Sequence, residues 1–352
     1  MKRLICAALA LVLMLGLGGC GEKKDKQVAV FWYSFEDAYL SEVRAVLDES
    51  WSSAGLSYRN YDAESRQATQ NEQIRTAISE GAAALVVNVV DASFDELTRQ
   101  ILDMARDADI PVVFFNRSIS EELLAGYRKA AYVGTDYKQA GHMQGQMIGS
   151  FVADHYELLD LNGDHCISYV MFKGQEGNEE ANARTKYAVE DANRCLAAAG
   201  KTNLQFYDPS NAARYLVDQD GAWSFEQGKD YMVNILKNDT EAAGNMVELV
   251  IANNDAMALG AIAALQEAGY NDGTGKTIPV FGVDATEDAQ QAIAAGAMTG
   301  TIRQDAAGMA MAIQRITQNL TDGKAIFSGL DQENVVGDQR INIPYSYYTG
   351  RE

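Results

Sequence analysis

The stretch VELVIANNDAMALGA (247–261) contains the pattern that decides the fold. Its first half is a short apolar run with little polar alternation, which is typical of a strand covered by helices on both faces. A polar cluster at 253–255 ends this run, and a helix-like segment follows at once. A strand followed by a crossover helix is the unit from which parallel sheets are built.

The same pattern recurs outward along the chain and predicts an α/β fold with parallel sheets. Strand-like runs alternate with amphipathic segments, and we find no internal repeat and no low-complexity tract. The other runs are VAVFWY (28–33), AALVVNVV (83–90), PVVFF (111–115), YVGTD (132–136), CISYVMF (166–172) and IPVFGVD (278–284).

Polar residues follow most of these runs, where the strands are expected to end. In open α/β sheets, ligands bind outside the carboxyl ends of the strands. Asn and Asp at such positions also cap the next helix, and capping is the better interpretation for Asp91 and Asp255. Both interpretations stay open for Asn116 and Asp284. The clusters are Glu36-Asp37, Asn88 with Asp91, Asn116-Arg117, Asn253-Asn254-Asp255 and Asp284.

The N-terminus predicts export. MKRLICAALALVLMLGLGGC has a basic start and an apolar run too short to span a bilayer as a mature helix. Its end resembles a bacterial lipoprotein box, which implies a signal peptide over 1–19, lipidation of Cys20 and a tether over 20–27. An ordinary secretory signal is the alternative. We therefore expect an exported chain held at the membrane by lipid, at the cell surface or in the periplasm.

Length, charge and cysteine content restrict the remaining chain. Residues 28–352 exceed what one hydrophobic core usually supports, so two domains are expected. The formal net charge of −20 disfavours nucleic acid and anionic lipid as partners. In an exported chain Cys166 and Cys195 are candidates for a disulfide, because a helix packed antiparallel on the preceding strand brings them to the same end. Two free thiols are the open alternative.

Catalytic motifs are scarce, and we do not expect an enzyme. His142, His155 and His165 lack the spacing of zinc sites or nucleophile motifs. GYNDGTGKT (269–277) ends like a phosphate-binding loop, but its glycine spacing is wrong and it precedes a strand instead of a helix.

DLNGDHCIS (160–168) begins like an EF-hand calcium loop, with oxygen-bearing residues at alternate positions. The twelfth position of such a loop is a glutamate, but here it is Met171. Either a distant carboxylate completes a metal site, or the segment is a polar turn.

Several segments together resemble the galactose/glucose-binding proteins of bacterial ABC importers, which are periplasmic binding proteins of type I. The resemblance runs from about residue 28 to 345, in family order. It implies two Rossmann-like lobes with parallel sheets, joined by a three-crossing hinge and closing on one sugar. The segments are VVFFN (112–116), YVGTD (132–136), DLNGDHCIS, KGQEGNEEANART (173–185), VIANNDAMALGA (250–261), IPVFGVDA (278–285) and GTIRQDA (300–306).

The resemblance also implies lobe boundaries. The N-terminal lobe is expected over 28–134 plus 305–338, and the C-terminal lobe over 135–304 plus 339–352. The hinge strands are expected near 133–136, 302–305 and 338–342.

The resemblance implies that structural Ca²⁺ binds the loop and that Glu248 supplies the missing carboxylate. Two residues depart from the family: His165 replaces a glycine, and Ser168 is shorter than the expected glutamine. The implied ligands are Asp160, Asn162, Asp164, the carbonyl of Cys166, Ser168 and Glu248.

A pyranose needs planar polar groups around its edge and aromatic rings on its faces. The positions that match the family's polar groups are Asp37, Asn116, Arg184, Asn254 and Asp284, and Trp223 and Tyr39 would stack.

Four positions depart from the family pattern: Asn178 replaces histidine, Glu180 aspartate, Tyr39 phenylalanine and Gln304 asparagine. These changes either compensate one another around the same hexose or shift the preference among monosaccharides.

The resulting hypothesis is a monomeric, lipid-anchored receptor that captures D-galactose or D-glucose by hinge closure for an ABC permease. One alternative keeps the fold but binds a pentose, a nucleoside or a signalling sugar. Another is a sugar sensor whose closed form binds a chemoreceptor or a sensor kinase. A glycoside-processing enzyme with Asp37 and Glu180 as its carboxylate pair is the alternative from a different class.

Overall fold

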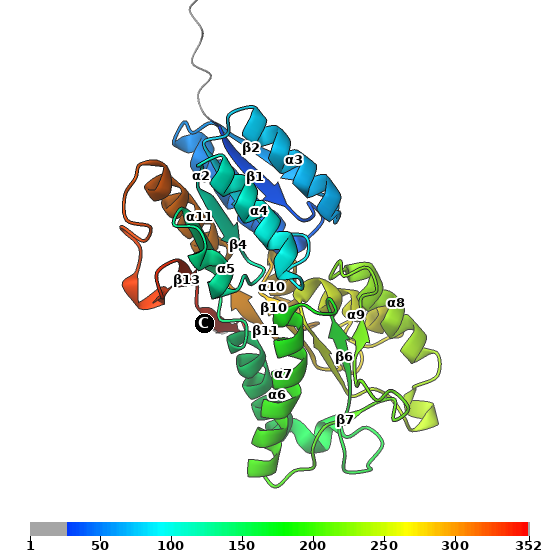
Figure 1. Ribbon diagram of the computed structural model, residues 1–352. Coiled ribbons are helices and arrows are strands. Elements are labelled where there is room, and N and C mark those ends of the chain that lie inside the picture. Colours follow the sequence, from blue (N-terminus) through cyan, green and yellow to red (C-terminus); the bar gives the residue numbers. More distant parts are fainter. Residues whose placement is uncertain (1–26, 351–352) are drawn as a thin grey trace, which may run out of the picture.

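A computed structural model describes residues 27–350 as two α/β lobes, each built on a seven-stranded sheet (Figure 1). The predicted signal peptide, Cys20 and residues 20–26 of the tether lie outside the described residues. Within the described range, no helix is both long and apolar enough to cross a membrane.

The N-terminal lobe has a sheet that is parallel except for one edge strand. Its strand order is β12 (Val335–Val336), β13 (Arg340–Asn342), β5 (Ala130–Gly134), β4 (Val112–Phe115), β3 (Ala84–Val87), β1 (Val28–Trp32) and β2 (Tyr58–Asp62).

Helices cover both faces of this sheet, as the unbroken apolar runs predict. α2 (Ala38–Ser53) and α11 (Ala306–Thr321) pack on the face that carries Val30 and Trp32. The opposite face, which carries Phe31, packs against the three helices α3 (Gln67–Ser79), α4 (Asp95–Asp107) and α5 (Glu121–Ala125).

The C-terminal lobe repeats the arrangement. Its main strand order is β14 (Tyr345–Tyr348), β11 (Gly300–Gln304), β10 (Val280–Asp284), β9 (Leu249–Ala252), β6 (Ser168–Lys173) and β7 (Gln205–Phe206), and β8 (Leu216–Val217) also pairs with β6. Its helices are α6 (Gln139–Leu159), α7 (Glu179–Ala198), α8 (Phe225–Leu236), α9 (Asp255–Glu267) and α10 (Glu287–Ala294). Short 3-10 helices lie at η1 (Glu241–Ala243) in this lobe and at η2 (Gln332–Asn334), just before β12.

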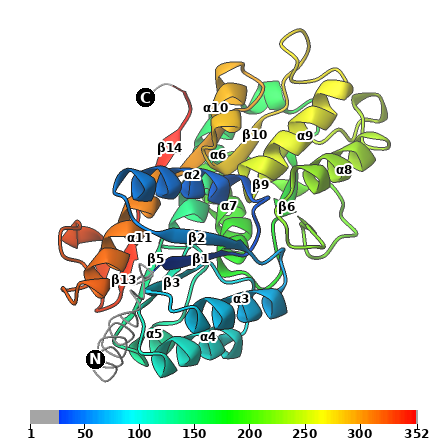
Figure 2. The same ribbon diagram turned by 90° about the horizontal axis from the view of Figure 1, so that it is seen from above.

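Helices α6 and α7 lie side by side in both views and approach closely (Figures 1 and 2). A Cβ on Gly141 would lie 2.6 Å from the Ala183 carbonyl oxygen, and one on Gly145 would lie 2.6 Å from that of Tyr187. Only glycine permits this contact, which fixes α7 and the residues at its N-terminus.

The chain crosses between the lobes at three places. It leaves β5 for α6 after Gly134 and returns from β11 to α11 at Asp305. The predicted third boundary, between 338 and 339, is wrong. Residues Arg340 to Asn342 pair in parallel with β5, and the Arg340 guanidinium stacks over Tyr132 in the N-terminal lobe. The third crossing therefore lies between Asn342 and Tyr345.

Of the two alternatives for the cysteines, the structure has free thiols at Cys166 and Cys195. Cys195 faces α6, where a Cβ on Gly149 would lie 2.5 Å from the Cys195 Cβ. The Cys166 thiol instead donates to the Asn203 carbonyl at 3.6 Å. Burial, followed by the carboxylate of Asp164, raises the pKa of the Cys166 thiol to about 11. Cys195 thus packs against α6, whereas the Cys166 thiol bonds the loop before β7.

Candidate ligand-binding site

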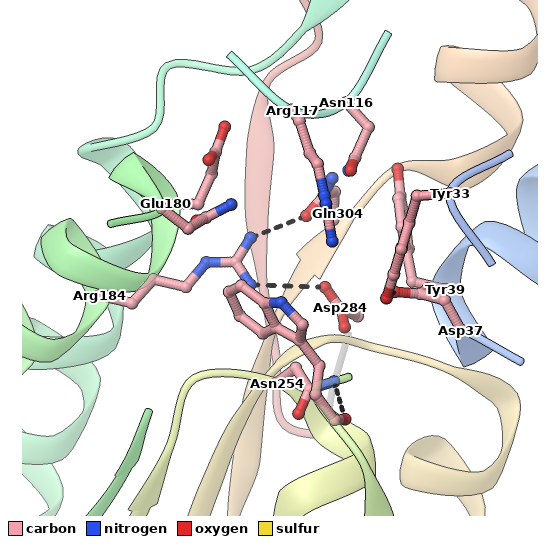
Figure 3. A pocket seen from close by; sticks show the side chains of 12 residues that line it. Tyr33, Asp37, Tyr39, Asn116, Arg117, Glu180, Arg184, Asn254, Asp284 and Gln304 are labelled. Carbon is pink, nitrogen blue, oxygen red and sulfur yellow. Dashed lines mark hydrogen bonds and ion pairs between the residues drawn. The ribbon is translucent and has the colours of Figure 1, made fainter. Parts of the chain in front are cut away.

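A cavity lies in the cleft between the two lobes, and all ten residues predicted from the sequence line it (Figure 3). Its empty volume is about 420 Å³, counting the part that opens to solvent. Cavities for small ligands in proteins span about 300–1,000 Å³. The lining residues are Tyr33, Asp37, Tyr39, Asn116, Arg117, Asn178, Glu180, Arg184, Trp223, Asn254, Asp284 and Gln304.

Most of these residues lie at the carboxyl end of a strand or at the start of the next helix. Asn116 follows β4, while Asp284 and Gln304 end β10 and β11. Parallel strands of each lobe point their carboxyl ends at the cleft, so polar residues far apart in sequence converge there.

Capping and lining are compatible functions here. Asp37 caps α2 through Oδ1, which accepts from the Leu40 N–H at 2.8 Å, and its Oδ2 accepts from the Tyr33 hydroxyl at 2.8 Å. Asn254 caps α9 in the same way, by accepting from the Met257 N–H at 3.1 Å. Asp255, expected to cap, instead accepts from the Thr301 hydroxyl at 2.7 Å behind the cavity.

Three cavity residues have left-handed backbone conformations that L-amino acids rarely adopt. The φ angles are 65° at Asn116, 56° at Trp223 and 126° at Asp284. Each costs about 1–3 kcal/mol and persists only where surrounding structure imposes it, which occurs mainly at functional sites.

Arg184 projects from α7 into the centre of the cavity (Figure 3). It donates to the Asn253 carbonyl at 2.8 Å and to Gln304 Oε1 at 3.0 Å, and it lies 3.9 Å from Asp284 Oδ1. Its Nε is buried and has no hydrogen-bond partner among residues 27–350. A buried donor in this state costs free energy until an acceptor satisfies it.

Two of the three carboxyl groups of the cavity, those of Glu180 and Asp284, are buried away from water. Burial raises the pKa of Asp284 well above its usual range, and the Arg184 cation opposes this shift. Burial also raises the pKa of Glu180, against the influence of Arg184 and Arg117. Desolvated carboxylates beside guanidinium groups are strong, oriented acceptors for hydroxyl donors.

Tyr33 and Arg117 line the cavity but were not predicted as site residues. The Arg117 guanidinium lies 3.7 Å from the centre of the Tyr33 ring and donates to the carbonyls of Val89 and Val90. The sequence pattern could have identified both residues. Arg117 belongs to the polar cluster after one strand, and Tyr33 ends the first apolar run.

Aromatic rings face the cavity from both lobes. The Trp223 ring packs on Gly174, where an added Cβ would lie 2.0 Å from the ring, and its backbone carbonyl accepts from the Asn254 amide at 3.0 Å. Tyr39 and Tyr33 come from the N-terminal lobe. Stacking of Trp223 and Tyr39 on a ligand stays a prediction.

The predicted metal loop lies at the amino end of β6, and the Glu248 carboxylate contacts it. Glu248 accepts from the backbone N–H groups of Leu161 at 2.6 Å and Ser168 at 2.8 Å. The Asp160 carboxylate accepts from the backbone of Gly163 and His165. The atoms that could bind a metal here are oxygens, which suit a hard cation such as Ca²⁺. In the part of the chain that the structure describes, no three His, Cys, Asp or Glu residues converge on one point.

Residues 28–325 match the family model of a periplasmic binding protein domain. The chain belongs to the periplasmic binding protein family. This confirms the predicted α/β architecture of two lobes.

One relative of this periplasmic binding protein is the D-galactose/methyl-galactoside binding periplasmic protein MglB of Haemophilus influenzae. It is 32% identical over 98% of this chain and 96% of its own length. A putative rhizopine-binding protein of Rhizobium meliloti is 29% identical over 99% of this chain and 96% of its own.

Solved structures agree with this assignment. An ABC transporter solute binding protein from Bacillus halodurans with bound myo-inositol matches with a TM-score of 0.67 at 25% identity, covering 94% of this chain and 96% of that one. A galactofuranose binding protein matches with a TM-score of 0.70 at 21% identity, covering 92% and 95%, and supports the fold alone.

Proposed function

We propose that this protein is a receptor that captures a monosaccharide by lobe closure and delivers it to an ABC permease. D-Galactose is the first candidate, because the Haemophilus influenzae relative is named for galactose and methyl-galactoside binding. D-Glucose is the second, because the sequence resembles galactose/glucose-binding proteins. The bound myo-inositol of the Bacillus halodurans protein keeps other cyclic polyols open.

The composition of the cavity wall carries this proposal. Three carboxylates, four amides and two guanidinium groups surround a space that tyrosine and tryptophan rings also line. A sugar offers hydroxyl groups, which donate and accept, at its edge and weakly apolar faces above and below. Carboxylates accept from hydroxyls, guanidinium groups donate to them, and amides do both.

Closure supplies the mechanism of capture. Tyr33, Asp37 and Asn116 come from the N-terminal lobe, whereas Arg184, Trp223 and Asp284 come from the C-terminal lobe. A ligand that bonds to both sets binds fully only when the lobes meet, so it shifts the population toward the closed state. No covalent step is required, and we propose that the protein is not an enzyme.

Asn178, Glu180 and Gln304 are the residues that we propose decide which sugar is preferred. They differ from the pattern of galactose/glucose-binding proteins and all line the cavity. A site built to bond one hydroxyl strongly rejects a ligand that lacks it. A pentose, a nucleoside or a signalling sugar therefore remains the second candidate class.

We further propose that Ca²⁺ binds at the 160–168 loop with Glu248, and that the exported chain is anchored by lipid on Cys20. The carboxylate, amide and carbonyl oxygens of the loop, with Glu248 held beside them, support the metal proposal. Presentation of the closed form to a chemoreceptor or sensor kinase is compatible with transport.

Calorimetric titration of residues 27–352 with D-galactose and D-glucose, with calcium and after chelation, tests the proposal. We expect one-to-one binding of at least one sugar. If neither binds, and a panel of pentoses, nucleosides and polyols also fails, the receptor proposal is wrong. Incubation with aryl glycosides should release no product. Release that depends on Asp37 and Glu180 would favour the enzyme alternative.

A further inference from the structure

The hydroxyl of Tyr345 lies at the point where the three interlobe crossings meet. It is 3.0 Å from Thr135 Oγ1, at the first crossing, and 3.3 Å from Gln304 Oε1, at the second. Tyr345 itself follows the third crossing. Arg184 Nη2 donates to the same hydroxyl at 3.1 Å.

Backbone pairing explains this convergence. Tyr345 is the direct partner of Gln304 between the antiparallel strands β14 and β11. Just before it, the Ile343 N–H donates to the Gly134 carbonyl at 2.7 Å, which holds the third crossing beside the first. The three crossings therefore run side by side, and one side chain reaches both of the others.

The hydrogen-bonding capacity of the hydroxyl is fully used. A tyrosine hydroxyl has one hydrogen to donate and two lone pairs that accept. Donation to Gln304 Oε1 leaves the lone pairs for Arg184 and Thr135, and all four side chains are at most 6% exposed. The Tyr345 hydroxyl therefore has no hydrogen and no lone pair left for another partner.

Tyr345 does not line the cavity, whereas Arg184 and Gln304 do. We infer that Tyr345 is a positioning residue that couples the orientation of Arg184 and Gln304 in the cavity to the hinge through Thr135. The inference rests on the proposed function for the identity of the ligand. It adds a residue that contacts the ligand-binding side chains and does not contact the ligand itself. Rotation of the backbone at the first crossing then moves the Tyr345 hydroxyl, and so changes a hydrogen bond that orients the Arg184 guanidinium group in the cavity.

Four variants test this coupling: Tyr345→Phe, Thr135→Val, the double variant and the control Tyr347→Phe. The control lies on the same strand, is 42% exposed and bonds Gln146 on the surface of α6. Titration with D-galactose, D-glucose and myo-inositol should show Tyr345→Phe weakened about tenfold, as expected for the loss of a hydrogen bond to a charged group. The control should bind as the unmodified protein does.

Thr135→Val is the decisive variant, because Thr135 does not line the cavity. It should weaken binding, and the double variant should be no weaker than Tyr345→Phe alone, since both changes break one network. Unchanged affinity in Thr135→Val, or additive losses in the double variant, would overturn the coupling.

A measurement without sugar separates this inference from the proposed function. Solution X-ray scattering of sugar-free Tyr345→Phe and Thr135→Val should give a larger radius of gyration than Tyr347→Phe, because the closed form loses a hinge contact. Equal radii in all three variants would overturn the inference. If the radii differ but no sugar binds the unmodified protein, the ligand assignment fails and the hinge function of Tyr345 stands.

Discussion

The Glu180 carboxylate in the C-terminal lobe accepts a hydrogen bond from the Ser118 backbone N–H in the N-terminal lobe, at 3.2 Å. A second contact joins the lobes where Glu42 of α2 accepts from the Glu287 N–H at the start of α10, at 3.0 Å. Both contacts need the lobes together, as in the closed form that we propose binds the ligand. In each of them a carboxylate of one lobe accepts from the backbone of the other.

Glu180→Gln should alter the pH dependence of stability. Because burial raises the pKa of Glu180, the folded protein binds its proton more strongly than the unfolded chain does. This contribution to stability is full below the unfolded pKa and is lost as pH rises through the folded pKa. The variant lacks that loss, so its free energy of unfolding relative to that of the unmodified protein should increase as the pH rises from the unfolded pKa of about 4.3 through the raised folded pKa. Urea denaturation across this range measures it.

Glu190→Gln is the matched control for this change, since Glu190 is exposed on the same helix α7, away from Glu180. Parallel pH profiles for Glu180→Gln and the unmodified protein would contradict the prediction. The Glu180→Gln variant should also bind sugar more weakly, because an amide is a poorer acceptor than a carboxylate. A gain in stability with a loss of affinity is typical of binding-site substitutions.

Trp223→Ala should weaken sugar binding by at least about tenfold, because the ligand loses an aromatic surface on one face. The left-handed conformation at this position strains alanine as well as tryptophan, so the melting temperature should change little. Trp223→Phe keeps a ring and should retain most of the affinity. Titration calorimetry beside thermal melts measures both, and undiminished binding by Trp223→Ala would remove stacking from the proposal.

Chelation of calcium should lower the melting temperature by several degrees while sugar affinity changes less. The loop at 160–168 lies at the amino end of β6, and the cavity lies at the opposite, carboxyl ends of the strands. An ion that binds only the folded form stabilises it by mass action. Melts with and without chelator measure the effect.

Glu248→Gln should remove the calcium dependence of the melting temperature. Asp272→Asn is its control, because the Asp272 carboxylate accepts from the backbone of Thr274 at 2.8 Å within another polar loop. Equal calcium effects in Glu248→Gln and the unmodified protein would refute the metal assignment.

Most of the site could be predicted from the sequence, because the topology alone brings the carboxyl ends of the strands together. Asn116, Asp284 and Gln304 each follow or end an apolar run, and the parallel sheets bring those ends together. Two features depend on contacts that no local pattern records. The third crossing was misplaced because the pairing of β13 with β5 decides its lobe. The thiols are not joined because Cys195 packs against α6 and the Cys166 thiol bonds the Asn203 carbonyl.

Asn178→His tests whether the departures from the galactose/glucose pattern set the sugar preference. Asn178 caps α7 by accepting from the Ala181 N–H at 2.9 Å, so its loss should cost about 1 kcal/mol of stability. Asn178→Asp keeps the cap and serves as the control for that loss. If Asn178 and Glu180 determine which hydroxyls are bonded, Asn178→His combined with Glu180→Asp should raise the affinity for D-galactose or D-glucose relative to other sugars of the panel. If the combined variant loses stability but ranks the sugars as the unmodified protein does, Asn178 acts only as the helix cap. The sugar preference then depends on residues elsewhere in the cavity.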